Sequence, residues 1–64
     1  MKPAEVVRRL KADDWYELPG KKTSHRQFKH PYKPGKVTVP FHKGRDINPV
    51  TLKNIELQSG VSMA

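Results

Sequence analysis

The sequence predicts an α+β fold in which two helices pack on a three-stranded antiparallel sheet, in the order helix, strand, strand, strand, helix. Three observations support this fold class. Apolar residues recur at helical spacing near both ends, apolar and polar residues alternate in the middle, and short turn sequences separate the alternating segments. Loops of hairpin length make neighbouring strands antiparallel. We therefore expect both helices to cover one face of the sheet and to leave the other face open.

The first predicted helix runs from Pro3 to Ala12. Proline suits the first helical turn, where its missing N–H group has no partner to lose. The apolar side of this helix is formed by Val6, Val7 and Leu10. The Asp13-Asp14 pair is predicted to end the helix, because aspartate tolerates turn conformations.

Three segments have the character of strands. Residues 15–18 (WYEL) are rich in strand formers, and the turn sequence PGKK follows them. Residues 25–30 alternate, so Arg26 and His30 share the side of Phe28. Residues 36–39 (KVTV) also alternate, and Pro40 ends this strand or marks a sheet edge. If Phe28 faces the core, the open face carries His25, Gln27, Lys29, Lys36 and Thr38.

The closing helix is predicted to begin at Pro49, with Asn48 as its N-cap, after a polar connection that turns at Gly44. Gly60 provides a C-terminal stop. The buried side is expected to consist of Val50 or Thr51, Leu52, Ile55 and Ser59, with Leu57 off that side.

Length and composition restrict the class of protein. The 64 residues form one domain, 1–64, and 34% hydrophobic residues suffice for one thin core layer but for no deep pocket. We therefore expect no cofactor. Cysteine is absent, which excludes disulfides and thiolate metal sites, and the three histidines have no tight zinc spacing. No run is apolar enough for a signal peptide or a membrane span, so we expect a soluble cytoplasmic protein.

The charge of the chain favours an anionic partner. Thirteen Lys and Arg residues against six Asp and Glu residues give a formal charge of +7, which attracts nucleic acid, an anionic membrane or an acidic protein. DNA is less favoured because three strands separate the two helices, unlike a helix-turn-helix. A membrane surface is disfavoured because neither helix has a broad apolar side with bulky anchors.

Two motifs identify a known family. The sequences S-H-R-Q-F-K-H-P (residues 24–31) and V-T-V-P-F-H (residues 37–42), with D-D-W (13–15) and Q-S-G (58–60), resemble the HicA-type mRNA interferase toxins of bacterial toxin–antitoxin pairs. The resemblance covers nearly all of the chain. It implies a fold like the double-stranded-RNA-binding domain, a ribosome-independent endoribonuclease activity on mRNA, catalysis by His25, and a HicB-type antitoxin that occludes the active face. The family commonly has Gly where Thr23 and Asp14 stand here.

The chemistry of RNA cleavage fits a histidine. RNA carries its own nucleophile, the 2′-hydroxyl, so cleavage needs a base, an acid for the leaving 5′ oxygen and positive charge for the phosphorane, but no metal. Because histidine titrates near neutral pH, His25 can serve either proton transfer. The residues expected to bind RNA or stabilise its transition-state charge are Lys22, Ser24, Arg26 and Lys29.

Several roles stay open at this point. The second proton-transfer group is His42, a lysine or water. His30, beside Phe28, is predicted to be structural. Trp15 and Tyr16 could stack on bases, although a tryptophan in so small a domain usually belongs to the core.

Two other classes of function also fit the sequence. The first is a non-catalytic RNA-binding module of the same fold, and the second is a basic protein that binds an acidic partner. A histidine on the open face favours the enzyme, because modules that read RNA shape typically use Lys and Arg for backbone contacts.

Overall fold

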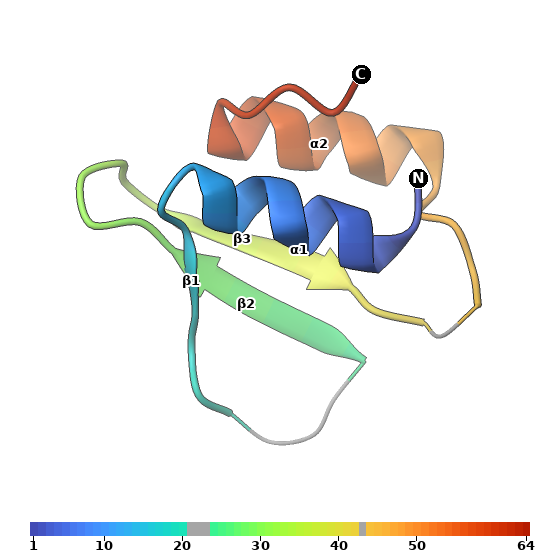
Figure 1. Ribbon diagram of the computed structural model, residues 1–64, viewed down its shortest axis with the longest axis horizontal. Coiled ribbons are helices and arrows are strands. Elements are labelled where there is room, and N and C mark those ends of the chain that lie inside the picture. The colour runs from blue at the N-terminus through green and yellow to red at the C-terminus, as the bar shows by residue number, and fades with distance from the viewer. Residues whose placement is uncertain (21–23, 43) are drawn as a thin grey trace.

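The predicted element order is confirmed by the computed structural model, which describes residues 1–20, 24–42 and 44–64. The elements are α1 (Pro3–Ala12), β1 (Tyr16–Glu17), β2 (His25–Lys29), β3 (Lys36–Pro40) and α2 (Pro49–Ser59) (Figure 1). The first strand is shorter than the sequence suggests. Trp15 still belongs to the turn that ends α1, and proline and glycine follow at positions 19 and 20.

The three strands form one antiparallel sheet in the order β1-β2-β3. The register of β2 and β3 runs from His25 opposite Pro40 to Lys29 opposite Lys36. This register places the inward side chains of the two strands on one face, and they bury Phe28, Val37 and Val39 completely. In this strand order, β2 is the central strand and pairs with both neighbours.

Both helices pack on the same face of the sheet, as predicted. The residues that form the shared core are Val6, Val7, Leu10, Trp15, Phe28, Val37, Val39, Ile47, Ile55 and Met63. Burial of a Leu, Ile or Phe side chain contributes about 1.5–3 kcal/mol, so this single layer supplies most of the apolar stabilisation. Neither helix is long and apolar enough to span a bilayer, as judged over the described residues.

The ends of the helices follow from local sequence. Helix α1 ends in a Schellman motif, in which the Trp15 N–H donates to the Leu10 carbonyl and the Asp14 N–H donates to the Lys11 carbonyl, both at 3.0 Å. Asp14 consequently has φ 72°, in the left-handed region that favours glycine. This conformation explains physically why glycine suits that position.

Helix α2 has the caps that its sequence predicts. The side chain of Asn48 accepts a hydrogen bond from the Val50 N–H at 2.8 Å, and Pro49 is the first helical residue. Gly60 ends the helix with φ 70°. Val50 itself is 70% exposed, so Thr51 and Leu52 are the partly buried residues at this end.

The loop between β2 and β3 is hydrogen-bonded to the end of α1 through the side chain of His30. The His30 side chain is only 5% exposed, and its Nε2–H donates to the Asp13 carbonyl at 2.6 Å. Its Nδ1 accepts from the backbone N–H groups of Tyr32 and Lys33, at 3.0 and 3.1 Å. The ring also lies edge-on to Trp15 at 5.1 Å. Because every polar ring atom is used within the fold, the structure supports the structural role predicted for His30.

Lys33 joins the C-terminal ends of the two helices. Its ammonium donates to the Asp13 carboxylate at 2.6 Å and to the Ser59 carbonyl at 3.0 Å. The hydrogen bond from Lys33 is the main reason that the pKa of Asp13 is lowered. The loop between β2 and β3 therefore contacts the ends of both helices, on the helical side of the sheet.

Candidate active site

His25 lies at the start of β2 on the face of the sheet that no helix covers, called the open face below and carrying the exposed residues His25, Gln27, Lys29, Lys36 and Thr38. Its Nδ1 lies 3.4 Å from the hydroxyl of Ser24, which is also exposed. A histidine on a paired strand is held more firmly than one on a loop. The sequence pattern alone placed His25 correctly, because side chains of a strand alternate between faces.

His42 lies beside His25. Their ring centroids are 6.4 Å apart, with an interplanar angle of 81°. The register explains this proximity. His25 is opposite Pro40, and the Phe41 N–H donates to the Ser24 carbonyl. The residues that follow β3 therefore lie next to the start of β2, and His42 is one of them. The structure thus brings together two imidazoles that lie 17 positions apart in the sequence.

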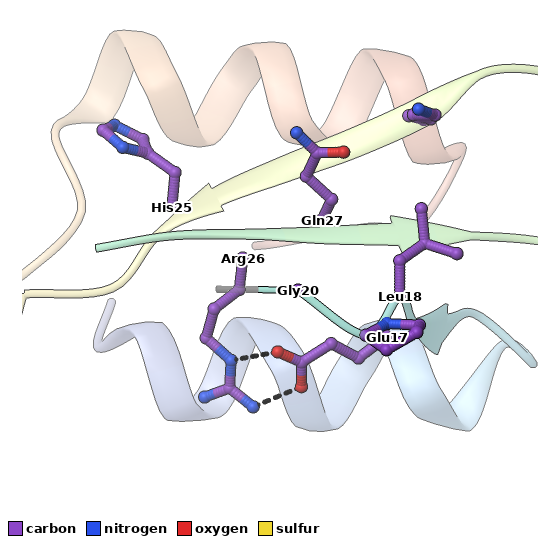
Figure 2. A pocket seen from close by; sticks show the side chains of 8 residues that line it. Glu17, Leu18, Gly20, His25, Arg26 and Gln27 are labelled. Carbon is purple, nitrogen blue, oxygen red and sulfur yellow. Dashed lines mark hydrogen bonds and ion pairs between the residues drawn. The ribbon is translucent and has the colours of Figure 1, made fainter. Parts of the chain in front are cut away.

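A cleft of about 460 Å³ adjoins His25, and its volume falls within the range usual for ligand sites. The residues that line this cleft are Glu17, Leu18, Pro19, Gly20, His25, Arg26, Gln27 and Lys36. Figure 2 shows the side chains of His25 and Gln27 leaving β2 in the direction opposite to that of Arg26. The cleft therefore connects the open face with the point where β1 diverges from β2.

Arg26 lies on the Phe28 side of β2, where alternation predicts it. Its Nε donates to a Glu17 carboxylate oxygen at 2.6 Å, and its Nη2 donates to the other oxygen (Figure 2). The guanidinium also stacks over the Phe41 ring at 4.6 Å. Hydrogen bonding within the pair lowers the pKa of Glu17 and raises the pKa of Arg26. Arg26 thus forms a wall of the cleft with its charge already balanced by a carboxylate.

The remaining predicted residues are distributed along the open face or outside the described chain. Lys29 is exposed at the end of β2, opposite Lys36. Four strand steps of about 3.3 Å separate it from His25 by roughly 13 Å. Lys22 lies outside the described residues, as does Thr23. Trp15 is 2% exposed and belongs to the core.

Sequence reasoning missed two contributors to the site. It did not single out Glu17, although the register Glu17 opposite Phe28 makes Glu17 a diagonal neighbour of Arg26. The sequence pattern placed Lys36 on the open face, but it did not predict that Lys36 lines the cleft beside His25. A search for a charged residue diagonal to Arg26 on the short first strand could have found the first of these.

Metal-ligating residues do not cluster in the part of the chain that the structure describes. Residues 1–20, 24–42 and 44–64 contain no group of three or more His, Asp or Glu side chains placed to hold a metal ion. The groups that the site offers for chemistry are two imidazoles, a hydroxyl and lysine ammoniums. These groups can transfer protons and bind anions.

Comparison with known proteins now identifies the class. The family model described as "HicA toxin of bacterial toxin-antitoxin" matches residues 3–61, and the chain therefore belongs to this family. A search of curated proteins gives no significant match.

Proposed function

We propose that this toxin is an endoribonuclease that cleaves mRNA by proton transfer between RNA and two histidines, and thereby inhibits translation and growth. The observation that carries the proposal is the pair of exposed imidazoles, His25 and His42, whose ring centroids lie 6.4 Å apart, with His25 lining a cleft. Membership in a toxin family adds that the activity harms the cell that makes it.

The spacing of the two rings suits one phosphodiester. A ring nitrogen must approach the oxygen it serves to about 2.6–3.2 Å. A phosphodiester that lies between the rings can therefore place the attacking 2′-hydroxyl at one ring and the leaving 5′ oxygen at the other. General acid–base catalysis of this kind contributes roughly 10²–10⁴-fold to the rate.

The reaction balances without a further reagent. His25 takes the proton of the 2′-hydroxyl, and the 2′ oxygen forms a bond to phosphorus. The bond from phosphorus to the 5′ oxygen breaks, and His42 gives its proton to that oxygen. The products are a 2′,3′-cyclic phosphate and a 5′-hydroxyl. Because RNA supplies the nucleophile and the two rings supply both proton transfers, the mechanism needs no metal.

Ser24 sets the ring atom of His25 that reacts. If the Nδ1–H of His25 donates to the Ser24 hydroxyl, 3.4 Å away, Nε2 keeps its lone pair and serves as the base. Lys29 and Lys22 bind phosphates of the strand. Arg26, which is already paired with Glu17, orders the wall of the cleft.

The experiment that tests this function is cleavage of a defined RNA in the presence of EDTA, with analysis of the new ends. We expect a 2′,3′-cyclic phosphate and a 5′-hydroxyl, and we expect a single 2′-deoxy substitution at the cleaved nucleotide to block the cut. Ends that carry a 5′-phosphate would contradict attack by the 2′-hydroxyl. Binding without cleavage would support the non-catalytic RNA-binding module instead.

The cognate antitoxin is proposed to be a HicB-type protein that covers the open face. The net charge of +7 favours an antitoxin surface that is acidic, which gives fast capture by charge complementarity. Both proteins then meet in the cytoplasm, where mRNA is translated. Mixing toxin and antitoxin should raise the melting temperature of the toxin and abolish cleavage. A complex that cuts RNA at the rate of free toxin would contradict occlusion.

A further inference from the structure

The end of the open face away from His25 carries two lysines directly opposite each other. Lys29 of β2 and Lys36 of β3 are register partners, and both are exposed. The hydrogen bond from Phe41 to Ser24 fixes the alternation of the ladder, and it makes Lys29 and Lys36 a non-hydrogen-bonded pair. Such pairs have Cα atoms about 4.5 Å apart, with their side chains close together. Like charges directly opposite on a sheet destabilise it.

These two lysines differ from most other described cations. Neither makes an ion pair or a side-chain hydrogen bond with any residue that the structure describes. The described cations that do pair with a carboxylate are Lys2, Arg8, Arg9, Arg26, Lys33 and Lys53. The positive charge of the open face is therefore not balanced internally at Lys29 and Lys36.

The cleft connects Lys36, one member of the lysine pair, with the candidate catalytic residue. His25, Gln27 and Lys36 line the same cleft, and Figure 2 shows His25 and Gln27 projecting from the same side of β2. Along the open face, a row of side chains runs from His25 at one end to Lys29 and Lys36 at the other. The uncharged register partners Gln27 and Thr38 lie between the two ends of this row. An anionic chain that lies along the row thus meets positive charge at one end and an imidazole at the other.

We propose that Lys29 and Lys36 form a phosphate subsite, which binds a linkage of the same RNA strand at a fixed distance from the linkage that is cleaved. The inference rests on the proposed function, because the strand enters the subsite while another of its phosphates lies at His25. An ammonium from each strand contacts the bound phosphate, and the repulsion within the pair is relieved when the phosphate is present.

The distance sets the position of the bound linkage. The subsite lies roughly 13 Å from His25 along β2. A stacked strand advances about 3.4 Å per nucleotide, so this distance spans about four stacked nucleotides. It spans fewer when the strand is extended. The subsite therefore requires an RNA strand that continues at least two nucleotides beyond the cut.

The test is a scan of a non-cleavable RNA, 2′-deoxy at the cleaved nucleotide, in which one linkage at a time is an uncharged methylphosphonate. Binding is measured for the wild type, for the double variant Lys29→Gln/Lys36→Gln and for the control Lys2→Gln/Lys53→Gln. The control removes the same charge from α2 and from the residue that precedes α1.

We expect one linkage, two to four nucleotides from the cut, whose neutralisation weakens wild-type binding about tenfold and leaves the Lys29/Lys36 variant unchanged. The control should keep the wild-type response at that linkage. The log–log salt slope of the Lys29/Lys36 variant should be shallower by about 0.7, the value for one phosphate on a single strand. In the free protein, Lys36→Gln should raise the melting temperature at low salt by about 1–5 °C.

A scan without a lysine-dependent linkage, in a protein that cleaves RNA, would overturn the subsite and leave the proposed function intact. The same loss of response in the control would also overturn the subsite, because it would make the effect one of net charge. A lysine-dependent linkage in a protein that never cleaves would refute the proposed function alone.

Discussion

Replacing Asp14 with glycine should stabilise this protein. Asp14 is the residue after the cap of α1, its φ is 72°, and it carries a negative charge at the negative end of the helix dipole. A residue with a side chain costs about 1–2 kcal/mol in this conformation, and aspartate is at the low end of that range. Glycine also raises the entropy of the unfolded chain, which reduces this gain by about 0.4–1 kcal/mol. Removal of the charge adds about 0.3–1 kcal/mol.

The net gain for Asp14→Gly is therefore about 1 kcal/mol. In a domain of this size that gain raises the melting temperature by about 4–8 °C. The assay is urea unfolding and thermal melting of the wild type, Asp14→Gly and Asp14→Asn. Asparagine removes the charge but keeps a side chain, so it separates the two contributions.

Ala12→Gly is the matched control, because Ala12 is the last residue of α1 and its substitution should cost about 0.5–1 kcal/mol. Two results would refute the reasoning. Asp14→Gly could fail to exceed the wild type, or Asp14→Asn could reproduce the whole gain, which would make the left-handed backbone irrelevant.

Three further predictions concern stability, pH and metal. His30→Ala should lower the free energy of unfolding by about 2–4 kcal/mol, because it removes a side chain that is only 5% exposed and leaves the Asp13 carbonyl and the Lys33 N–H without their ring partner, while cleavage per folded molecule is unchanged. Chemical unfolding beside a cleavage assay checks this, and an unaltered stability would contradict it. Since Arg26 lowers the pKa of Glu17 below its ordinary value of 4.5, the pair stabilises the fold above that pH and loses its contribution as the pH falls through the lower folded value. The stability difference between wild type and Glu17→Gln should therefore shrink from pH 7 to pH 3, and a constant difference would count against the pair. Cleavage should persist in EDTA, and a requirement for added Mg²⁺ or Mn²⁺ would remove the proposed acid–base mechanism.

The fold was largely predictable because its signals are local. Proline at positions 3 and 49 and glycine at position 60 mark helix boundaries, and the alternation of β2 and β3 assigned the open face correctly. A period of two leaves only two choices, and the bulk of Phe28 decides between them. The boundaries of β1 were less accurate because a Schellman turn and a proline compete with the strand-forming residues.

The arrangement of the site was less predictable because it depends on strand register. The proximity of His25 and His42 requires that His25 face Pro40, which neither strand states by itself. The pairing of Arg26 with Glu17 similarly needs the offset between β1 and β2. Periodicity gives the face of a residue, whereas only the folded sheet gives its neighbours.

The measurement that tests the central claim most directly is single-turnover cleavage by His25→Ala, with a thermal melt of the same preparation. His25 is exposed and forms no part of the core, so its loss should change stability by less than about 0.5 kcal/mol. The account predicts a normal melt, RNA affinity close to that of the wild type, and a cleavage rate reduced by at least about 10²-fold. A His25→Ala protein that melts normally and cuts RNA at the wild-type rate would contradict catalysis by His25.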